Sequence, residues 1–339
     1  MARIHCKMSP LAVYLIVLAF YSAFMMLACL NVSLEEEEDV REPIRTKLAA
    51  LQIGEEMGME YKDEVEEEEE ARSVRNKING RAQHSRSWLR TVDDFYTRAG
   101  TLETKCTKTV SFGGTYCRGA KDNNKVVCMD EDVALIPKHC TAYSFGIGSD
   151  ATFDDQMARY GCDVFMFDPS VSKGPIESSN LARQTFNLLG LDVSTYNRTH
   201  RLEYVEDGRT EDVVGTYDTY DNIRRYLGHE SRPVHYLKLD IENTEWRVLP
   251  YLMENSRLAG VKQLAIEVHT MGILYAPQHK VLDMLYKFWE ILEGLTRLGF
   301  LRAWYRPNLV LESLYKVPGQ NRSIATCFEV LYLRRGPVY

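Results

Sequence analysis

The segment that most limits the fold of this chain is an apolar strand pattern that ends in Gly146-Ile147-Gly148 and leads into a helical pattern. The next apolar segment, at residues 164–167, ends in Asp168, 22 residues after Gly146. Glycines at the carboxyl end of a strand let the backbone turn tightly and approach a ligand. An acid at the end of the next strand can reach the hydroxyls of a ribose. Together these features predict an α/β fold that binds a nucleoside.

The alternation of strand and helix patterns continues over residues 141–335. Strands are predicted at residues 142–145, 164–167, 235–239, 263–268, 300–305 and 328–333. Helices are predicted at residues 153–160, 179–189, 244–254 and 281–298. Such alternation indicates a mostly parallel, Rossmann-like sheet with helices on both faces.

The first 30 residues predict a membrane anchor. Residues 11–30 carry no charge, and a helix of about 20 apolar residues spans the ~30 Å of a bilayer core. Basic residues precede this run and acidic residues follow it, so we expect residues 1–10 to be cytosolic and the remainder lumenal. The chain is then a type II membrane protein of the endoplasmic reticulum or Golgi. Cleavage as a signal peptide remains an alternative, and it gives a secreted protein.

Residues 31–90 predict an acidic stem, and residues 91–140 a cysteine-bearing lead-in segment. Residues 34–71 hold 16 acidic residues against 4 basic ones, which accounts for the net charge of -7. A negative chain of this kind is not expected to bind nucleic acid.

Cysteines and glycosylation motifs agree with a lumenal location. An even number of cysteines follows the apolar run, and they are Cys106, Cys117, Cys128, Cys140, Cys162 and Cys327. In an oxidising compartment this number favours disulfides, which we predict for the group from Cys106 to Cys140 with the pairing left open. N-glycosylation acceptor motifs begin at Asn31, Asn197 and Asn321.

A second polar motif follows the strand predicted at residues 235–239. It reads Asp240-Ile241-Glu242, and the next strand ends with Glu267 and His269 close together. Parallel strands deliver such side chains to one edge of a sheet. Carboxylates and an imidazole with its ordinary pKa of ~6.5 can remove protons near neutral pH. The four residues are therefore predicted as catalytic.

These motifs resemble the methyltransferase-like protein 24 group, which is similar to the FkbM-type methyltransferases. The matching segments read Tyr-Ser-Phe-Gly-Ile-Gly-Ser-Asp, Phe-Asp-Pro-Ser and Leu-Lys-Leu-Asp-Ile-Glu-Asn-Thr-Glu-Trp. The resemblance covers about residues 90–335. It implies a class I methyltransferase fold and S-adenosylmethionine as the cofactor. Asn243 stands where the FkbM pattern has glycine, which leaves the backbone geometry at this position open.

The resemblance also implies roles for particular residues. Phe145, Gly146, Gly148 and Asp150 are expected to line the cofactor loop, and Asp168 is expected to bind the ribose. FkbM-type enzymes methylate hydroxyl oxygens, often on sugars. The implied acceptor is therefore a hydroxyl of a glycan, a protein or a small molecule, and no metal ion is assigned.

Two other functions fit parts of the sequence. In a metal-dependent Golgi glycosyltransferase, Asp240 and Glu242 would hold Mn²⁺ against a nucleotide sugar. Alternatively, a catalytically inactive protein could keep the fold for binding alone. Binding of S-adenosylmethionine and dependence on manganese separate these alternatives.

Overall fold

The computed structural model describes residues 88–117, 120–148, 150–171, 182–203, 210–309 and 314–335. They belong to the unit Trp88–Tyr339. The predicted tail, the predicted anchor and nearly all of the predicted stem lie outside the described residues. Among the helices of the described residues, none combines the length and the apolar composition needed to cross a membrane.

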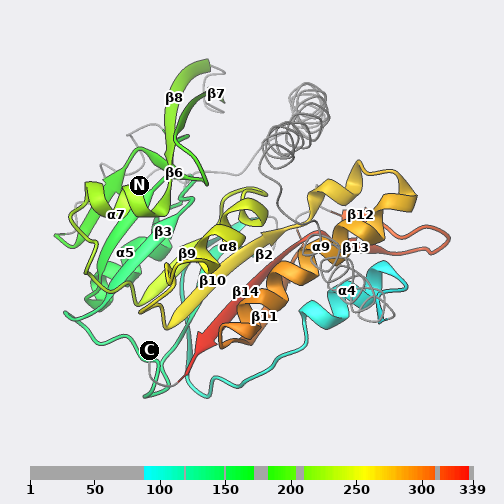
Figure 1. Ribbon diagram of the computed structural model, residues 1–339, viewed down its shortest axis with the longest axis horizontal. Coiled ribbons are helices and arrows are strands. Elements are labelled where there is room, and N and C mark those ends of the chain that lie inside the picture. The colour runs from blue at the N-terminus through cyan, green and yellow to red at the C-terminus, as the bar shows by residue number, and fades with distance from the viewer. Residues whose placement is uncertain are drawn as a thin grey trace, which may run out of the picture. The chain divides into compact units, whose positions relative to one another are not determined.

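A seven-stranded sheet forms the centre of the fold, in the order β11-β14-β10-β9-β3-β4-β5 (Figure 1). Its strands are β3 (Thr141–Phe145), β4 (Asp163–Phe167), β5 (Gln184–Asn187), β9 (Tyr236–Leu239), β10 (Gln263–His269), β11 (Phe300–Asn308) and β14 (Cys327–Arg334). Neighbours from β5 to β10 pair in parallel, whereas β14 runs antiparallel to both β10 and β11. The predicted Rossmann-like, mostly parallel sheet is therefore confirmed.

All six predicted strands are present, and their ends differ from the prediction by at most three residues. The strands β3 and β10 are buried at every position. Continuous apolar runs of this kind are typical of parallel strands that are covered on both faces.

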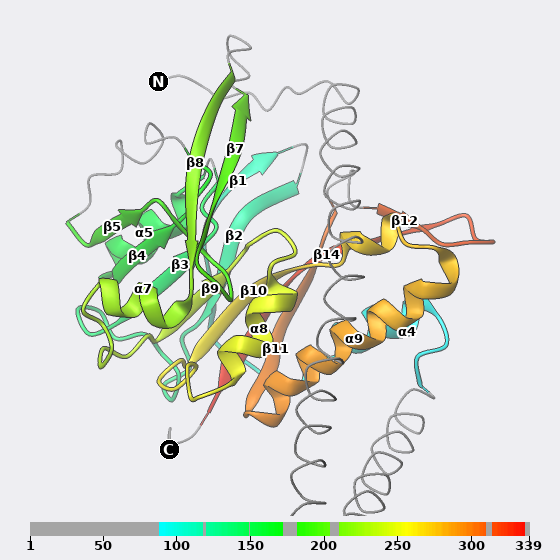
Figure 2. The same cartoon turned by 45° about the horizontal axis from the view of Figure 1, so that its top comes forward.

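Helices cover both faces of the sheet, as predicted. They are α4 (Val92–Ala99), α5 (Thr152–Tyr160), α7 (Tyr220–Tyr226), α8 (Glu245–Met253) and α9 (Gln278–Arg297). One apolar core joins α4, α7, α8 and α9 to one face of the sheet. A second core joins the other face to α5 and to a hairpin of β1 (Thr109–Cys117) and β2 (Ala120–Cys128). Figure 2 shows α8 and α9 along the sheet and the hairpin beside it.

The prediction of a helix at residues 179–189 is wrong for the residues that the structure describes there. Residues 184–187 form β5, which pairs in parallel with β4 at the sheet edge. Its sequence Gln-Thr-Phe-Asn includes a β-branched and an aromatic residue, both suited to a half-buried strand. Pairing with a neighbouring strand therefore outweighs the helix-like spacing of the apolar residues.

A smaller sheet follows β5 in the chain. Its strands, in the order β6-β8-β7, are β6 (Leu189–Leu191), β7 (Tyr196–Glu203) and β8 (Thr210–Asp218). Both views show β7 and β8 projecting away from the central sheet (Figures 1 and 2). A Cβ atom at Gly215 would lie 2.3 Å from the carbonyl oxygen of Pro169, so the small sheet packs closely on the turn that follows Asp168. A short hairpin of β12 (Leu314–Lys316) and β13 (Ser323–Ala325) lies further along the chain.

Two disulfides join the lead-in segment to itself and to the sheet. Cys106 bonds to Cys128, and Cys140 bonds to Cys162. The predicted disulfides are thus present, although Cys140 pairs beyond the group proposed from the sequence. Cys327 is buried in β14 and takes part in neither bond.

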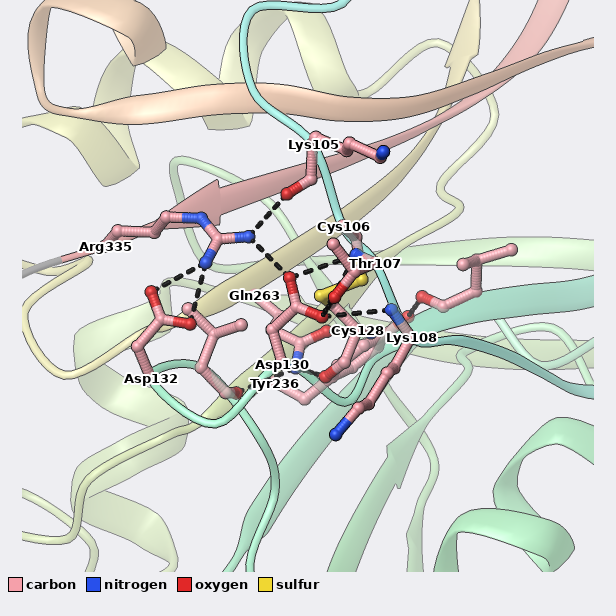
Figure 3. Close-up of a disulfide and its surroundings, with 12 residues drawn as sticks. Lys105, Cys106, Thr107, Lys108, Cys128, Asp130, Asp132, Tyr236, Gln263 and Arg335 are labelled. Carbon is pink, nitrogen blue, oxygen red and sulfur yellow. Dashed lines mark hydrogen bonds and ion pairs between the residues drawn. A yellow bond between two sulfur atoms is a disulfide. The ribbon is translucent and has the colours of Figure 1, made fainter.

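The base of the hairpin is fixed to the sheet by polar contacts around the first disulfide (Figure 3). The Gln263 side chain accepts a hydrogen bond from the backbone N–H of Cys128 and donates to its carbonyl oxygen, at 2.8 and 2.7 Å. The Tyr236 hydroxyl donates to the carbonyl oxygen of Val126 at 2.9 Å. The end of β2 is therefore held in a defined position above the sheet.

Candidate active site

The order of the central strands reverses between β3 and β9, because the chain adds β4 and β5 on one side and then β9 and β10 on the other. In open α/β sheets, ligands bind beyond the carboxyl ends of the strands at such a point. Gly146, Asp168 and Asp240 directly follow β3, β4 and β9. The structure thus brings these three predicted site residues to one edge of the sheet.

Gly146 occupies a position that has no room for a side chain. Its φ is +80°, in the left-handed region, and a Cβ atom would lie 1.7 Å from the carbonyl oxygen of Asp240. Its N–H donates to the carbonyl oxygen of Phe167 at 2.9 Å. Only glycine fits here, because the loop after β3 passes directly against the backbone after β9.

Gly148 lies in open surroundings. Its φ is +59°, and no atom of the described residues lies within 4 Å of the place a Cβ atom would take. The loop therefore has a crowded side at Gly146 and an open side at Gly148, on which a ligand can approach the backbone.

The Asp168 carboxylate holds this loop in place. One oxygen accepts hydrogen bonds from the backbone N–H groups of Ile147 and Gly148, at 2.8 and 2.9 Å. The other accepts from the N–H and hydroxyl of Ser170, at 2.8 and 2.7 Å. A carboxylate has about four acceptor positions, and all four are occupied within the protein. These contacts give Asp168 a role in shaping the loop, and its expected contact with a ribose stays a prediction.

The two other predicted loop residues have local roles in the structure. The Phe145 side chain is fully buried and stacks on Phe167, with ring centroids 4.5 Å apart, so it lies in the core and not at the sheet edge. The Asp150 carboxylate accepts a hydrogen bond at 2.9 Å from the N–H of Thr152, the first residue of α5.

Lys238 is a site residue that the sequence analysis missed. It is 4% exposed and donates to the carbonyl oxygen of Gly146, and its Nζ lies 3.7 Å from Oδ2 of Asp240. A lysine inside an otherwise apolar strand was the available signal, because a buried charge needs a partner.

A second missed residue, Lys125, lies at the centre of an ionic cluster beneath the hairpin. Its side chain is fully buried, and Nζ lies 3.0 Å from Asp240, 3.0 Å from Glu267 and 2.5 Å from Glu329. Glu267 and Glu329 are directly opposite each other on β10 and β14. Like charges in such a cross-strand pair repel, so the lysine from β2 supplies the cation that this part of the sheet requires.

Charge within this cluster is unevenly shared. Burial alone lowers the pKa of Lys125, but the three carboxylates outweigh burial and raise it well above 10.5. Burial also raises the pKa of Glu267, yet Lys125 and His269 outweigh it and hold that pKa well below its usual range. The pKa of Glu329 is raised well above 4.5 by burial, which Lys125 only partly offsets. The lysine thus favours the ionised form of Glu267, while burial opposes ionisation of Glu329.

His269 lies between buried and exposed carboxylates. Its Nδ1 is 3.0 Å from Oε1 of Glu245, which is completely buried, and its Nε2 is 3.7 Å from Glu242 and 4.0 Å from Glu267. Burial alone lowers the pKa of His269, but the surrounding carboxylates outweigh it and raise that pKa well above 6.5. The sequence analysis assumed an ordinary pKa for this residue, whereas the fold raises it, and the catalytic assignment of His269 stays a prediction.

The turn after β9 presents Glu242 at the surface. Glu242 and Asn243 have φ values of +53° and +71°. Asn243 thus adopts the left-handed conformation that suits the glycine of the FkbM pattern, which asparagine tolerates better than most residues. The Glu245 side chain also accepts a hydrogen bond from the N–H of Ile241 at 2.9 Å, which closes this turn.

Asp154 on α5 provides a test of the electrostatics beside the loop. Burial raises the pKa of this carboxyl to about 6, with Lys238 opposing the shift. Because the folded pKa lies above the unfolded value of 3.8, the folded state loses stability as pH rises from about 4 to 6 and does not recover it above 6. We expect Asp154→Asn to remove this loss, so that the variant gains about 2 kcal/mol on the wild type as pH rises from 4.5 to 7.5.

Chemical denaturation at several pH values measures this difference. The matched control is Asp132→Asn, whose carboxylate is 45% exposed. A stability difference between Asp154→Asn and the wild type that stays constant with pH would contradict the raised pKa.

Comparison with known proteins adds to this geometry. Residues 61–313 match a family model described as a methyltransferase domain. Probable methyltransferase-like protein 24 from Rattus norvegicus is 29% identical over 231 residues, which cover 64% of this chain and 58% of that protein. The Homo sapiens protein of the same name is 33% identical over 155 residues, covering 42% of this chain and 37% of that protein. The resemblance to this group is confirmed, over less than two thirds of the relatives' length.

Solved structures match more distantly. A putative hemolysin from Lactococcus lactis is 14% identical, with a TM-score of 0.32 and coverage of 59% of this chain and 82% of that chain. A similarity at this level carries no argument about function.

Proposed function

Since this chain belongs to the methyltransferase-domain family that its residues 61–313 match, we propose that it transfers a methyl group from S-adenosylmethionine to a hydroxyl oxygen. The observation that carries this proposal is the glycine loop at the strand reversal, with Gly146 pressed against the backbone of Asp240 and Gly148 open to a ligand. The acceptor we propose is a hydroxyl of a glycan, a protein or a small molecule.

The residues at this edge fit such a cofactor. The loop of Gly146 and Gly148 offers its backbone to a ligand, and Asp168 keeps that loop in shape. When bound, S-adenosylmethionine supplies a methyl group on a positively charged sulfur. The backbone of Asp240 lies against the loop and Glu242 follows two residues later, and negative charge in this segment favours a cationic ligand.

The acidic residues also suit a hydroxyl acceptor. A hydroxyl oxygen becomes a better nucleophile when its proton is removed. We assign Asp240, Glu242, Glu267 and His269 to this task as a group. Asp240 and Glu267 are held by Lys125, and His269 by Glu245. Glu242 is the exposed member, with 79% of its side chain accessible to solvent. An acceptor that approaches from solvent can therefore contact it directly.

Calorimetric titration of the purified full chain with S-adenosylmethionine tests the cofactor. We expect Asp168→Asn to weaken binding by about 1–3 kcal/mol, because an amide cannot accept hydrogen bonds at all four positions and the loop loses its shape. Asp132→Asn, which alters an exposed acid away from the loop, should bind as the wild type does. A folded chain that binds no S-adenosylmethionine would remove the proposal.

We further propose that the domain lies in the lumen of the secretory pathway. The two disulfides support this address, because such bonds form and persist in oxidising compartments. Asn197 and Asn321 are both exposed, so either can accept a glycan. We expect endoglycosidase treatment of the chain from eukaryotic cells to lower its mass, and the double variant Asn197→Gln with Asn321→Gln to lose most of that shift. A wild-type mass that the enzyme leaves unchanged would count against this address.

A further inference from the structure

The acidic edge beside the glycine loop contains a group of side chains with the chemistry of metal ligands. One ligand atom from each of Asp240, Glu242 and His269 lies within 4.8 Å of the others. They come from the ends of β9 and β10, two neighbouring parallel strands. Two carboxylate oxygens and an imidazole nitrogen form a donor set that suits a divalent ion such as Mn²⁺.

The His269 ring offers one nitrogen to a ligand. His269 is 4% exposed, yet its Nε2 lies 3.7 and 4.0 Å from the nearest described carboxylate oxygens, beyond hydrogen-bond distance. These distances leave Nε2 open to a ligand that comes from outside the chain. The ring therefore presents Nε2 toward Glu242, with no described side chain at bonding distance.

Glu245, outside the group of three, fixes the orientation of the ring. Its carboxylate is completely buried and accepts the hydrogen bond from Nδ1–H of His269 at 3.0 Å. Histidines that bind metals commonly donate their second ring N–H to a carboxylate in this way, which sets the tautomer and aims the other nitrogen at the ion. The arrangement leaves Nε2 as the ring atom available to a ligand.

The contact with Lys125 leaves one oxygen of Asp240 available for a metal ion. Lys125 donates to Oδ2 of Asp240, so Oδ1 is the oxygen left for another partner. The carboxylates around Nε2 favour positive charge there, and a divalent cation would take the place of a proton on the ring.

We propose that Asp240, Glu242 and His269 bind one divalent cation, with Glu245 as the positioning residue for His269. This site rests on the proposed function and deepens it. A cation next to the glycine loop would take the acceptor hydroxyl as a further ligand and lower its pKa, which lets a weak base remove the proton. The acceptor class that such a site favours is an alcohol with a second oxygen close enough to chelate the ion.

Titration of the purified full chain with Mn²⁺ tests the site without any enzyme assay. Free Mn²⁺ is measured by its electron paramagnetic resonance signal, which falls as the ion binds. We expect one Mn²⁺ per chain, binding abolished in Glu242→Gln and in His269→Gln, and binding about 10- to 100-fold weaker in Glu245→Gln. Glu254→Gln is the matched control, because this acid at the end of α8 is 69% exposed, and it should bind as the wild type does.

Circular dichroism and thermal unfolding of each variant show that lost binding is not lost folding. Since Glu242 is exposed, its variant should unfold at nearly the wild-type temperature. A folded chain that binds no Mn²⁺, or binding that survives in Glu242→Gln, would overturn the metal site.

Calorimetry with S-adenosylmethionine is run in parallel. Cofactor binding without Mn²⁺ binding rejects the metal site alone, whereas Mn²⁺ binding without cofactor binding supports the site and rejects the proposed function.

Discussion

Replacing Lys125 by methionine will lower the free energy of unfolding by about 3–5 kcal/mol. The side chain is fully buried, and its ammonium is the shared partner of Asp240, Glu267 and Glu329. Removing one member of a buried ionic group leaves the remaining charges without compensation in a region that water does not reach. Because domains are stable by only about 5–15 kcal/mol in total, this single change takes away a large part of the stability.

Chemical denaturation of the full chain at neutral pH measures this effect. Lys287→Met is the matched control, because Lys287 is exposed on α9, and we expect it to change stability by less than about 0.5 kcal/mol. If Lys125→Met were as stable as the control, the carboxylates would have to be neutralised by some other means.

Substitution of Gly146 by alanine will abolish S-adenosylmethionine binding and destabilise the fold. The added Cβ atom would lie 1.7 Å from the backbone carbonyl oxygen of Asp240, and backbone cannot rotate away as a side chain can. Either β3 and β9 move apart at their carboxyl ends or the glycine loop changes its course. Both outcomes disturb the surface to which the ligand is proposed to bind.

Gly228→Ala separates the clash from the cost of the backbone angle. Gly228 has a φ of +67°, close to the +80° of Gly146, but within the described part of the chain nothing lies within 4 Å of its Cβ position. We expect Gly228→Ala to cost about 1–2 kcal/mol from the left-handed conformation alone, and Gly146→Ala to cost more by about 2 kcal/mol. Equal costs in denaturation, with calorimetric binding retained in Gly146→Ala, would show that the loop is not packed as described.

The sequence was sufficient to predict the parts of the site that follow strands directly. Gly146, Asp168 and Asp240 each stand at the end of an apolar run, and in a parallel sheet all such ends meet at one edge. The strands themselves were predictable for the same reason, since a continuous apolar segment of five to seven residues is the pattern of a strand that is buried on both faces.

The partners of Lys125 could not be predicted in this way. Its three carboxylates are 115, 142 and 204 residues away in the chain. The hairpin that carries it also precedes the first strand of the sheet. Strand and helix periodicity describes local structure, and it contains no information on which segment covers a given face.

The behaviour of Asp168 and His269 was hidden for a different reason. Both residues were placed correctly at strand ends, but hydrogen bonds and charges from other segments determine what they do. Asp168 accepts from the loop that precedes it in the chain, and three surrounding carboxylates raise the pKa of His269. Such effects depend on distances of a few ångströms that only the folded structure defines.

The position of Lys125 under the hairpin also sets an order for events during synthesis of the chain. A ribosome makes β2 long before it makes β14, so the lysine has no complete set of partners until Glu329 has emerged. Burial of an uncompensated ammonium is unfavourable, so the hairpin should stay accessible on the nascent chain even after the Cys106–Cys128 bond has formed. Stalled chains that stop before Glu329 should therefore be cut by protease within β1 and β2, whereas chains that include β14 should resist.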